Sequence, residues 1–304
     1  KHKNRVEYND RKFNKIIWLY RNHANGFGCG QTMLGQRIVT AVILIVLLLA
    51  ALIWLPQTAW TLLVAALVLV AAYEWARLSG YSRNATLIYL ALTLIVFWLA
   101  LSYQSTDEYW HGLPIYLIAA LFWFVLAPLW LAKGYQNRDT VSMAITGWVV
   151  IVPTGLAMIF LPRPFELLAL MATVWVSDIA AYFSGRAFGK HKLAPAISPG
   201  KTWEGVAGAL IATLIYAEGL QRMGFSFAQS GTQGYTLKIT ALLLMLACLG
   251  ILGDLFESWM KRTAGVKDSG NILPGHGGVL DRIDALTSTL PIAALALGLM
   301  GRLQ

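Results

Sequence analysis

The sequence has little charge and few cysteines. Asp, Glu, Lys and Arg make up 13% of the 304 residues, whereas 57% are hydrophobic. Soluble domains carry about a quarter of their residues as charged side chains, so this composition excludes an ordinary soluble domain. The two cysteines, Cys29 and Cys248, are too few and too differently placed for a disulfide framework or a metal cluster. The sequence also lacks an internal repeat and a low-complexity tract.

Long apolar runs dominate instead. A membrane-spanning helix needs about 20 consecutive apolar residues. Nine stretches meet this requirement, at roughly 37–55, 58–78, 84–104, 112–132, 141–161, 165–185, 203–222, 237–257 and 283–301. The sequence therefore predicts an all-α fold, a polytopic membrane helical bundle of about nine transmembrane helices.

The distribution of Lys and Arg between these spans predicts the orientation, because cytoplasmic loops are enriched in both residues. With the N-terminus inside, the inner loops carry twelve of them and the outer loops four. The inner set is Arg77, Arg83, Lys133, Arg138, Arg186, Lys190, Lys192, Lys201, Lys261, Arg262, Lys267 and Arg282, and the outer set is Arg163, Arg222, Lys238 and Arg302. The two most charged loops, 186–202 and 258–284, then face the cytoplasm, where nucleotides are found.

Residues 1–32 differ from the remainder, with seven Lys and Arg against two acids. One interpretation is an arm attracted to anionic lipid headgroups. The other is a poorly ordered or non-native extension. We favour the second, because Met33 is followed at once by LGQRIVTAVILIVLLL, a typical start for a first membrane helix.

A first polar segment follows the sixth span and contains Asp178 and the run SPGKT, residues 198–202. This run lacks the first glycine of a Walker motif, and no soluble strand precedes it. Ser198, Gly200 and Lys201 nevertheless offer backbone amides and a cation just before a predicted helix, a combination that favours phosphate binding. The other lysines of this loop fit an ordinary positive-inside loop.

A second polar segment ends the eighth span. Asp254, Ser258 and Lys261 follow one another at i, i+4 and i+7 and so share one helical face. A ligand site and a buried structural Asp254–Lys261 pair are equally compatible with this spacing. Glu257 lies off that face and could point to an adjacent helix or to water.

Glu74, in the second span beside Trp75, is interpreted as half of a helix-end salt bridge.

A third polar segment opens the ninth span with Asp281 and Asp284. Two antiparallel helices would bring Asp254 and Asp281 to similar depth, and paired aspartates supply the oxygen ligands that Mg²⁺ prefers. His276 is expected to bind a phosphate or to orient an aspartate, since hard cations seldom use imidazole. For the neighbouring glycines at 277 and 278, close approach of the backbone to a ligand competes with a simple sharp turn.

These segments resemble the phosphatidate cytidylyltransferases, also called CDP-diacylglycerol synthases. The positions that match the family's signature are Ser258, Lys261, Arg262, Lys267, Asp268, His276, Gly277, Gly278, Asp281, Arg282 and Asp284. The runs GKHKLAPAISPGKTWEG and LGDLFES are similar to the family's other characteristic segments. A weaker likeness covers the whole of 33–304, whereas 1–32 match nothing in the family.

The resemblance implies an enzyme of the bacterial inner membrane that joins phosphatidic acid to CTP, giving CDP-diacylglycerol and pyrophosphate, with Mg²⁺ required and a second cation allowed. It also implies a nine-span homodimer embedded in membrane lipid, with no nucleic-acid partner. We expect residues 33–304 to form the membrane domain, with the catalytic part mainly in 165–304 and the active site facing the cytoplasm.

By resemblance, Asp254 and Asp281 correspond to the metal ligands. Asp178 and Asp284 are candidates for additional or outer ligands. The expected catalytic set carries positive charge or hydrogen-bond donors to the phosphates: Lys201, Lys261, Arg262, Lys267, His276 and Arg282. The expected substrate-binding set is Ser198, Gly200, Lys201, Ser258, Asp268, Gly277 and Gly278, in which Asp268 orients Lys267 or Arg262.

Two other functional classes fit parts of the sequence. A CTP-dependent lipid kinase would share the architecture but transfer the γ-phosphoryl group. A transporter would also carry intramembrane acids, but its inverted repeat is missing and the charges gather at one face. A CDP-alcohol phosphotransferase is excluded because the paired DG and AR spacing of its active site is absent.

Overall fold

A computed structural model of the protein describes residues 30–104, 112–136, 139–162, 164–225, 233–273 and 277–300. Residues 1–29 of the N-terminal extension and His276 lie outside these ranges, so the expectations for them stay predictions. Ordered along the chain, the helices and strands are α2 (Gly30–Trp54), α3 (Gln57–Leu78), α4 (Arg83–Gln104), α5 (Leu113–Leu121), the π-helical η2 (Phe122–Leu126), α6 (Ala127–Lys133), α7 (Thr140–Phe160), α8 (Phe165–Phe188), β1 (Lys192–Ala194), β2 (Ser198–Thr202), α9 (Trp203–Arg222), α10 (Gln233–Ala264) and α11 (Leu280–Leu299).

The all-α membrane bundle is confirmed. Each of the nine predicted spans coincides with a helix, the fourth being the continuous rod 113–133 made of α5, η2 and α6. Within the described residues, seven helices are long and apolar enough to cross a membrane. The two predicted spans that fall short are α2, whose described apolar part is only Val39–Trp54, and α9, which is less apolar.

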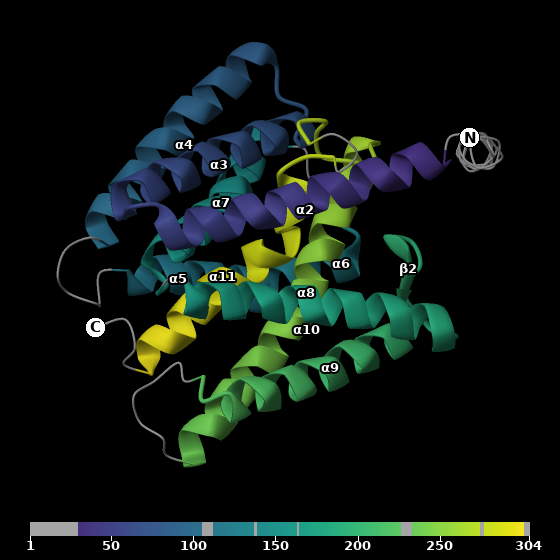
Figure 1. The fold of residues 1–304 in the computed structure, drawn as a ribbon. Coiled ribbons are helices and arrows are strands. Elements are labelled where there is room, and N and C mark those ends of the chain that lie inside the picture. Colours follow the sequence, from purple (N-terminus) through teal and green to yellow (C-terminus); the bar gives the residue numbers. More distant parts are fainter. Residues whose placement is uncertain are drawn as a thin grey trace, which may run out of the picture.

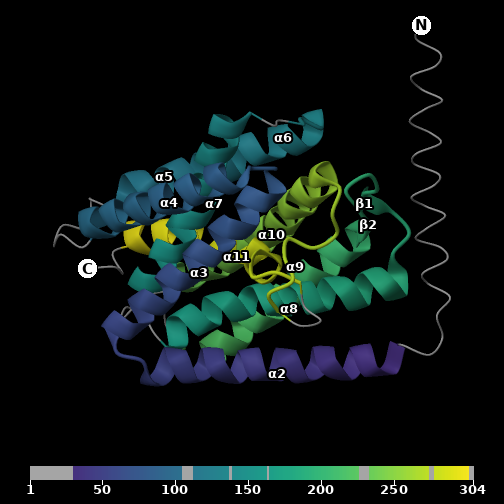
Figure 2. The same cartoon turned by 90° about the horizontal axis from the view of Figure 1, so that it is seen from above.

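Helix α11 is the centre of the bundle. It contacts α10, α7, α5, α8 and α3, and most of its residues are buried. Figure 1 shows α8 and α9 side by side, with α10 leading from α9 back to the centre. Seen from above, α2 runs along one edge of the bundle and α5 and α6 along the opposite edge, with α11 between them (Figure 2). The polar start of α11 is therefore surrounded by other helices.

An aromatic cluster fixes the rotation of α10 about its own axis. The Phe256 ring makes edge-on contacts with Phe122, Trp123 and Trp130 at centroid distances of 5.3, 5.6 and 5.8 Å. Its stacked contact with Trp75 of α3 is 6.5 Å. Such ring pairs add specific geometry to apolar burial. Phe256 is held against η2 and α6. The polar face of α10, which begins at Asp254, therefore faces α8 and α11.

Small residues bring α8 and α9 close together. A Cβ atom on Gly205 would lie 2.9 Å from the Ala181 carbonyl oxygen, and one on Gly208 would lie 2.1 Å from Ser184 Oγ. Such close approach of backbones is typical of helix pairs in membranes. Thr202 caps α9 by accepting a hydrogen bond from Gly205 N at 3.1 Å. The residue before this cap, Lys201, is thereby held at the end of α8.

The segment between α8 and α9 is a β-hairpin and not the predicted loop. Strands β1 and β2 pair antiparallel, with Lys192 opposite Thr202 and Ala194 opposite Ser198. The run SPGKT is thus a strand. Pro and Gly within it have low strand propensity, so the sequence pattern does not signal a strand, and pairing with β1 decides its conformation.

Candidate active site

The hairpin delivers Lys201 to α10. Its ammonium nitrogen lies 2.6 Å from Asp254 Oδ2 and donates to the Ile251 carbonyl at 3.2 Å. Ser258 Oγ donates to the other carboxylate oxygen, Asp254 Oδ1, at 3.2 Å. The predicted common face of Asp254 and Ser258 is confirmed. Two of the predicted polar segments therefore meet at one carboxylate.

Lys261 turns to α11 instead of to Asp254. Its ammonium nitrogen lies 2.6 Å from Asp281 Oδ1 and also forms an ion pair with Glu257 on its own helix. The alternative of a structural Asp254–Lys261 pair is therefore wrong. Because the side chains of Lys261, Glu257 and Asp281 are 13%, 5% and 3% exposed, this is a largely buried cluster of one ammonium and two carboxylates, in which the loss of Lys261 would leave both carboxylates uncompensated.

Four donor groups lie within hydrogen-bond distance of Asp281. In addition to Lys261, Ser269 N and Ser269 Oγ each lie 2.9 Å from Asp281 Oδ2, and Gly278 N lies 2.8 Å from the same atom. Hydrogen bonds to an ionised carboxylate are roughly twice as strong as neutral ones. The carboxylate at the start of α11 therefore organises the preceding segment around itself.

The two glycines before α11 explain how that segment comes so close. Gly277 has a φ of +81°, and a Cβ atom there would lie 2.6 Å from Asp281 Oδ2. A Cβ atom on Gly278 would lie 2.2 Å from Ser269 Oγ. The positive φ of Gly277 supports the explanation by a sharp turn. Gly278 leaves room for side chains of the chain itself, and close approach to a ligand stays a prediction. Within the chain, the backbone of these two glycines approaches the Asp281 carboxylate and its partner Ser269.

Glu74 is the residue that the sequence interpretation missed. It is fully buried on α3 and accepts hydrogen bonds from Val279 N at 3.0 Å and Leu280 N at 2.7 Å. It also lies 2.9 Å from Ser269 Oγ, whose single hydrogen it shares with Asp281. Its interpretation as half of a helix-end salt bridge is wrong. The available signal was its position, since an acid inside an apolar span indicates a functional site by default.

Two further carboxylates lie within electrostatic range of Asp254 and of one another. Asp254 of α10 interacts with Asp178 of α8 and with Asp284 of α11, and Asp178 also interacts with Asp284. Carboxylate oxygens are the donors that hard divalent cations prefer, so the chemistry of this set fits Mg²⁺. Within the described residues, however, no group of three or more His, Cys, Asp or Glu side chains is arranged to hold a metal ion. Lysine ammonium groups contact Asp254 and Asp281.

The remaining predicted residues lie around these clusters. Four of them are exposed: Arg262 near the end of α10, Lys267 and Asp268 just after this helix, and Arg282 in the first turn of α11. Ser198 is partly buried, and Gly200 is exposed, with nothing within 4 Å of the place that a Cβ atom would take. Unlike Gly278, Gly200 has no steric need to be glycine within the chain.

A sequence profile of the Cytidylyltransferase family matches residues 35–300, which include every predicted site residue. The chain belongs to this cytidylyltransferase family. Among its similar relatives is a phosphatidate cytidylyltransferase of Pseudomonas aeruginosa, 39% identical over 290 residues that cover 88% of this chain and 98% of the relative. A protein of the same name from Haemophilus influenzae is 34% identical over 85% of this chain and 96% of its own length.

The similarity extends to more distant bacteria. The phosphatidate cytidylyltransferase of Mycobacterium leprae is 30% identical over 274 residues, covering 82% of this chain and 81% of the relative. These alignments span most of each protein and are not confined to the charged loops. The cytidylyltransferase similarity therefore applies to the membrane bundle as well as to the site.

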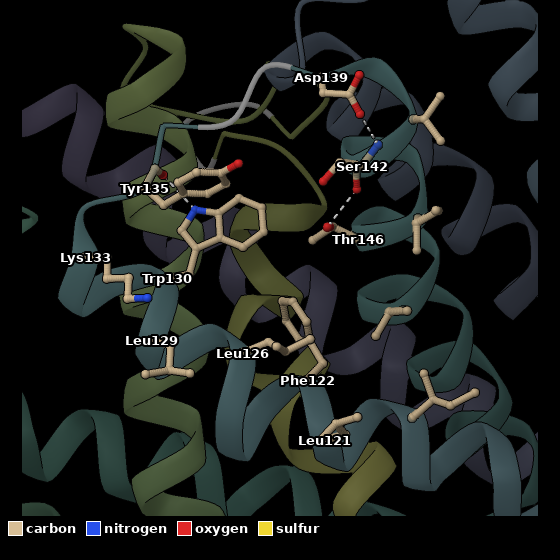
Figure 3. Close-up of a pocket in the computed structure, with 14 residues that line it drawn as sticks. Leu121, Phe122, Leu126, Leu129, Trp130, Lys133, Tyr135, Asp139, Ser142 and Thr146 are labelled. Atoms are coloured by element: carbon tan, nitrogen blue, oxygen red, sulfur yellow. Dashed lines mark hydrogen bonds between the residues drawn. The ribbon is translucent and has the colours of Figure 1, made fainter.

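This cytidylyltransferase also has an apolar cavity of about 820 Å³ between the rod 113–133 and α7. Figure 3 shows Phe122, Leu126, Leu129 and Trp130 on one side and Thr146 on the other. The cavity is connected to the site by packing, since Trp130 contacts Phe256, two residues after Asp254.

Proposed function

We propose that this chain is a phosphatidate cytidylyltransferase, which transfers the cytidylyl group of CTP to phosphatidic acid and releases pyrophosphate. The observation that carries the proposal is the meeting of Lys201 with Asp254 and of Lys261 with Asp281. All four residues lie in the matched part of the family, and relatives at 30–39% identity bear this enzyme's name.

The reaction needs charge neutralisation more than a base. A phosphate monoester is largely ionised near neutral pH, because its second pKa is about 6. One of its oxygens attacks the α-phosphorus of CTP, a new P–O bond forms, and the bond to the β-phosphate oxygen breaks, so that pyrophosphate leaves with the electron pair. Phosphoryl-group chemistry of this kind depends mainly on positioning and electrostatic stabilisation.

Lysine and arginine side chains supply that stabilisation. Lys201 and Lys261 are held ready by carboxylates from α10 and α11. We assign them to the oxygens of the two substrates, with the exposed Arg262, Lys267 and Arg282 around them. Each ammonium then exchanges a carboxylate partner for a phosphate partner, which keeps the charge compensated.

Asp254 and Asp281 remain the proposed ligands of Mg²⁺. The interactions of Asp254 with Asp178 and Asp284 support including those two carboxylates in the set. When bound, Mg²⁺ would neutralise charge on the pyrophosphate group. Lys201 and Lys261 must then move away from Asp254 and Asp281, because these carboxylates would bind the metal ion.

The remaining parts of the proposal concern the surroundings of the enzyme. We place the site on the cytoplasmic face of a bacterial inner membrane, which the excess of Lys and Arg on the predicted inner loops supports. We also propose a homodimer, by resemblance to the family. The apolar cavity lined by Phe122 and Ile145 suits an acyl chain of the lipid substrate, because pockets for apolar ligands are mainly apolar.

The purified protein tests this function directly. CTP labelled at the α-phosphorus should transfer its label to lipid in the presence of Mg²⁺, with release of pyrophosphate. Transfer of a γ-phosphorus label, with release of CDP, would instead establish a lipid kinase. Omission of Mg²⁺ should stop transfer, and Asp254→Asn should do so while leaving the membrane-inserted protein folded. Full activity without any divalent cation would contradict the metal assignment.

A further inference from the structure

We propose that Glu74 of α3 is a positioning residue for the reaction. Its carboxylate fastens the start of α11 and, through Ser269, holds the donors that orient Asp281. The relevance to catalysis rests on the proposed function, whereas the contact itself can be tested independently. Glu74 lies in the N-terminal half of the chain, far in sequence from the segments that carry the predicted site.

The first part of the argument is the cap on α11. The N-cap residue Val279 provides no side-chain hydrogen bond to the helix. Glu74 Oε1 accepts from Val279 N and Glu74 Oε2 accepts from Leu280 N. The first amides of a helix lack partners within it and favour a negative charge. A carboxylate from α3 therefore performs the capping that α11 does not perform for itself.

The second part is the bridge to Asp281. Ser269 Oγ lies 2.9 Å from Glu74 Oε2 and 2.9 Å from Asp281 Oδ2, and Ser269 N lies 2.9 Å from the same Asp281 atom. The hydroxyl has one hydrogen and donates it to one of the two carboxylates at a time, so a shift of the Glu74 carboxylate displaces the residue whose N–H and hydroxyl both face Asp281. Asp281 in turn holds Lys261.

The third part is the space around the carboxylate. A Cβ atom on Gly270 would lie 2.4 Å from Glu74 Oε1, and one on Gly278 would lie 2.4 Å from both carboxylate oxygens. The segment is therefore wrapped closely around Glu74, whose side chain is 0% exposed. Burial of a carboxylate is costly unless hydrogen bonds compensate it. An apolar residue would serve α3 equally well as a membrane helix, so the function of Glu74 lies in its contacts with Ser269, Gly270 and residues 278–280.

The variant Glu74→Gln tests the proposal with little change in size. The amide nitrogen that replaces one oxygen cannot accept an N–H, and the negative charge at the start of α11 is lost. We expect kcat for CDP-diacylglycerol formation to fall about tenfold or more, the effect of losing a hydrogen bond to a charged group. The KM values for CTP and phosphatidic acid should change little, since Glu74 touches neither substrate in this arrangement. Amide hydrogen exchange at Ser269, Val279 and Leu280 should become faster.

The matched control is Glu218→Gln, which makes the same chemical change at an exposed residue paired with Arg222 on α9. It should leave kcat and the exchange of the three amides unchanged. Wild-type kcat in Glu74→Gln would overturn the proposal. So would a loss of kcat without faster exchange at the three amides.

A double-mutant cycle separates positioning from general weakening of α3. Ser269→Ala removes the bridging hydroxyl group without touching α3. If Glu74 acts on Asp281 through Ser269, the two effects on ln kcat are not additive. Additive effects would overturn the proposal. If Glu74→Gln does not fold, Ser269→Ala alone tests the proposal. Wild-type kcat and wild-type amide exchange in Ser269→Ala would show that the Ser269 hydroxyl does not link Glu74 to Asp281. If the wild-type protein makes no CDP-diacylglycerol, the proposed function fails, and the exchange comparison still tests the Glu74 contact.

Discussion

The ammonium nitrogen of Lys201 lies 2.6 Å from the Asp254 carboxylate, so an ion pair attaches the hairpin before α9 to the C-terminal third of α10. The side chains are 21% and 35% exposed, respectively. A pair that is only partly buried can be opened by a ligand at lower cost than a fully buried pair. This relationship makes Lys201 available to a phosphate group while keeping it in place in the absence of one.

Replacing Lys201 with Ala should impair the use of CTP more than the use of phosphatidic acid. The loss of a charge-assisted hydrogen bond to a phosphate oxygen predicts a rise of about 10- to 100-fold in KM for CTP. Steady-state kinetics with each substrate varied in turn measures the difference. Lys192→Ala, at an exposed position in β1 of the same hairpin, is the control and should have little effect. An equal loss for both substrates would contradict the assignment to the nucleotide.

Replacing Asp281 with Asn should abolish CDP-diacylglycerol formation while the bundle remains folded. The substitution removes a proposed ligand of Mg²⁺ and one of the two carboxylate partners of Lys261, which predicts a loss of activity of about 100-fold or more. Activity and thermal unfolding should be measured on the same preparation. Glu218→Gln, which neutralises an exposed carboxylate paired with Arg222 on α9, is the control. Retained activity of Asp281→Asn at saturating Mg²⁺ would count against the site.

Replacing Gly278 with Ala should disturb the segment before α11. The added methyl group would lie 2.2 Å from Ser269 Oγ and 2.4 Å from both carboxylate oxygens of Glu74. Overpacking of this kind predicts destabilisation by about 1 to 3 kcal/mol, together with loss of activity. Thermal unfolding provides the measurement. Gly219→Ala on α9, with nothing within 4 Å of the new atom, should be neutral or stabilising. Equal thermal midpoints for the two variants would show that the predicted clash does not occur.

Replacing Ile145 with Trp should fill part of the apolar cavity and weaken use of the lipid. If the cavity holds an acyl chain, displacement of about two buried CH₂ groups predicts a rise of about tenfold in KM for phosphatidic acid. The KM for CTP should not change. Ile88→Trp on α4 is the control, at an exposed position outside the cavity lining. Unchanged kinetics for the lipid in Ile145→Trp would remove the acyl-chain assignment.

Several features of the fold were predictable because they depend on neighbours in the sequence. The predicted span 203–222 coincides with α9, and the predicted 58–78 differs from α3 by one residue. The common face of Asp254 and Ser258 follows from helical spacing alone. By contrast, α10 begins before and ends after the predicted 237–257, since polar residues continue a helix that the apolar pattern cannot follow.

Other features had no local signal. The hairpin formed by β1 and β2 contains Pro199 and Gly200, which do not indicate a strand. Glu74 resembled a helix-end acid, because its partners Val279 and Leu280 are more than 200 positions away. The sequence also did not indicate which carboxylate pairs with which lysine. Helical spacing suggested Asp254 for Lys261, whereas Asp254 binds Lys201 and Lys261 binds Asp281.

The sequence by itself determined that the protein is a membrane bundle, where its helices lie and which polar segments set it apart. Those properties follow from the cost of placing side chains in hydrocarbon, which adds up residue by residue along the chain. Only the tertiary structure decided which charges are paired and that α3 contributes to the site. Ion pairs and hydrogen bonds act over a few ångströms, and the packing of α3, α10 and α11 brings residues within that range that the linear order keeps far apart.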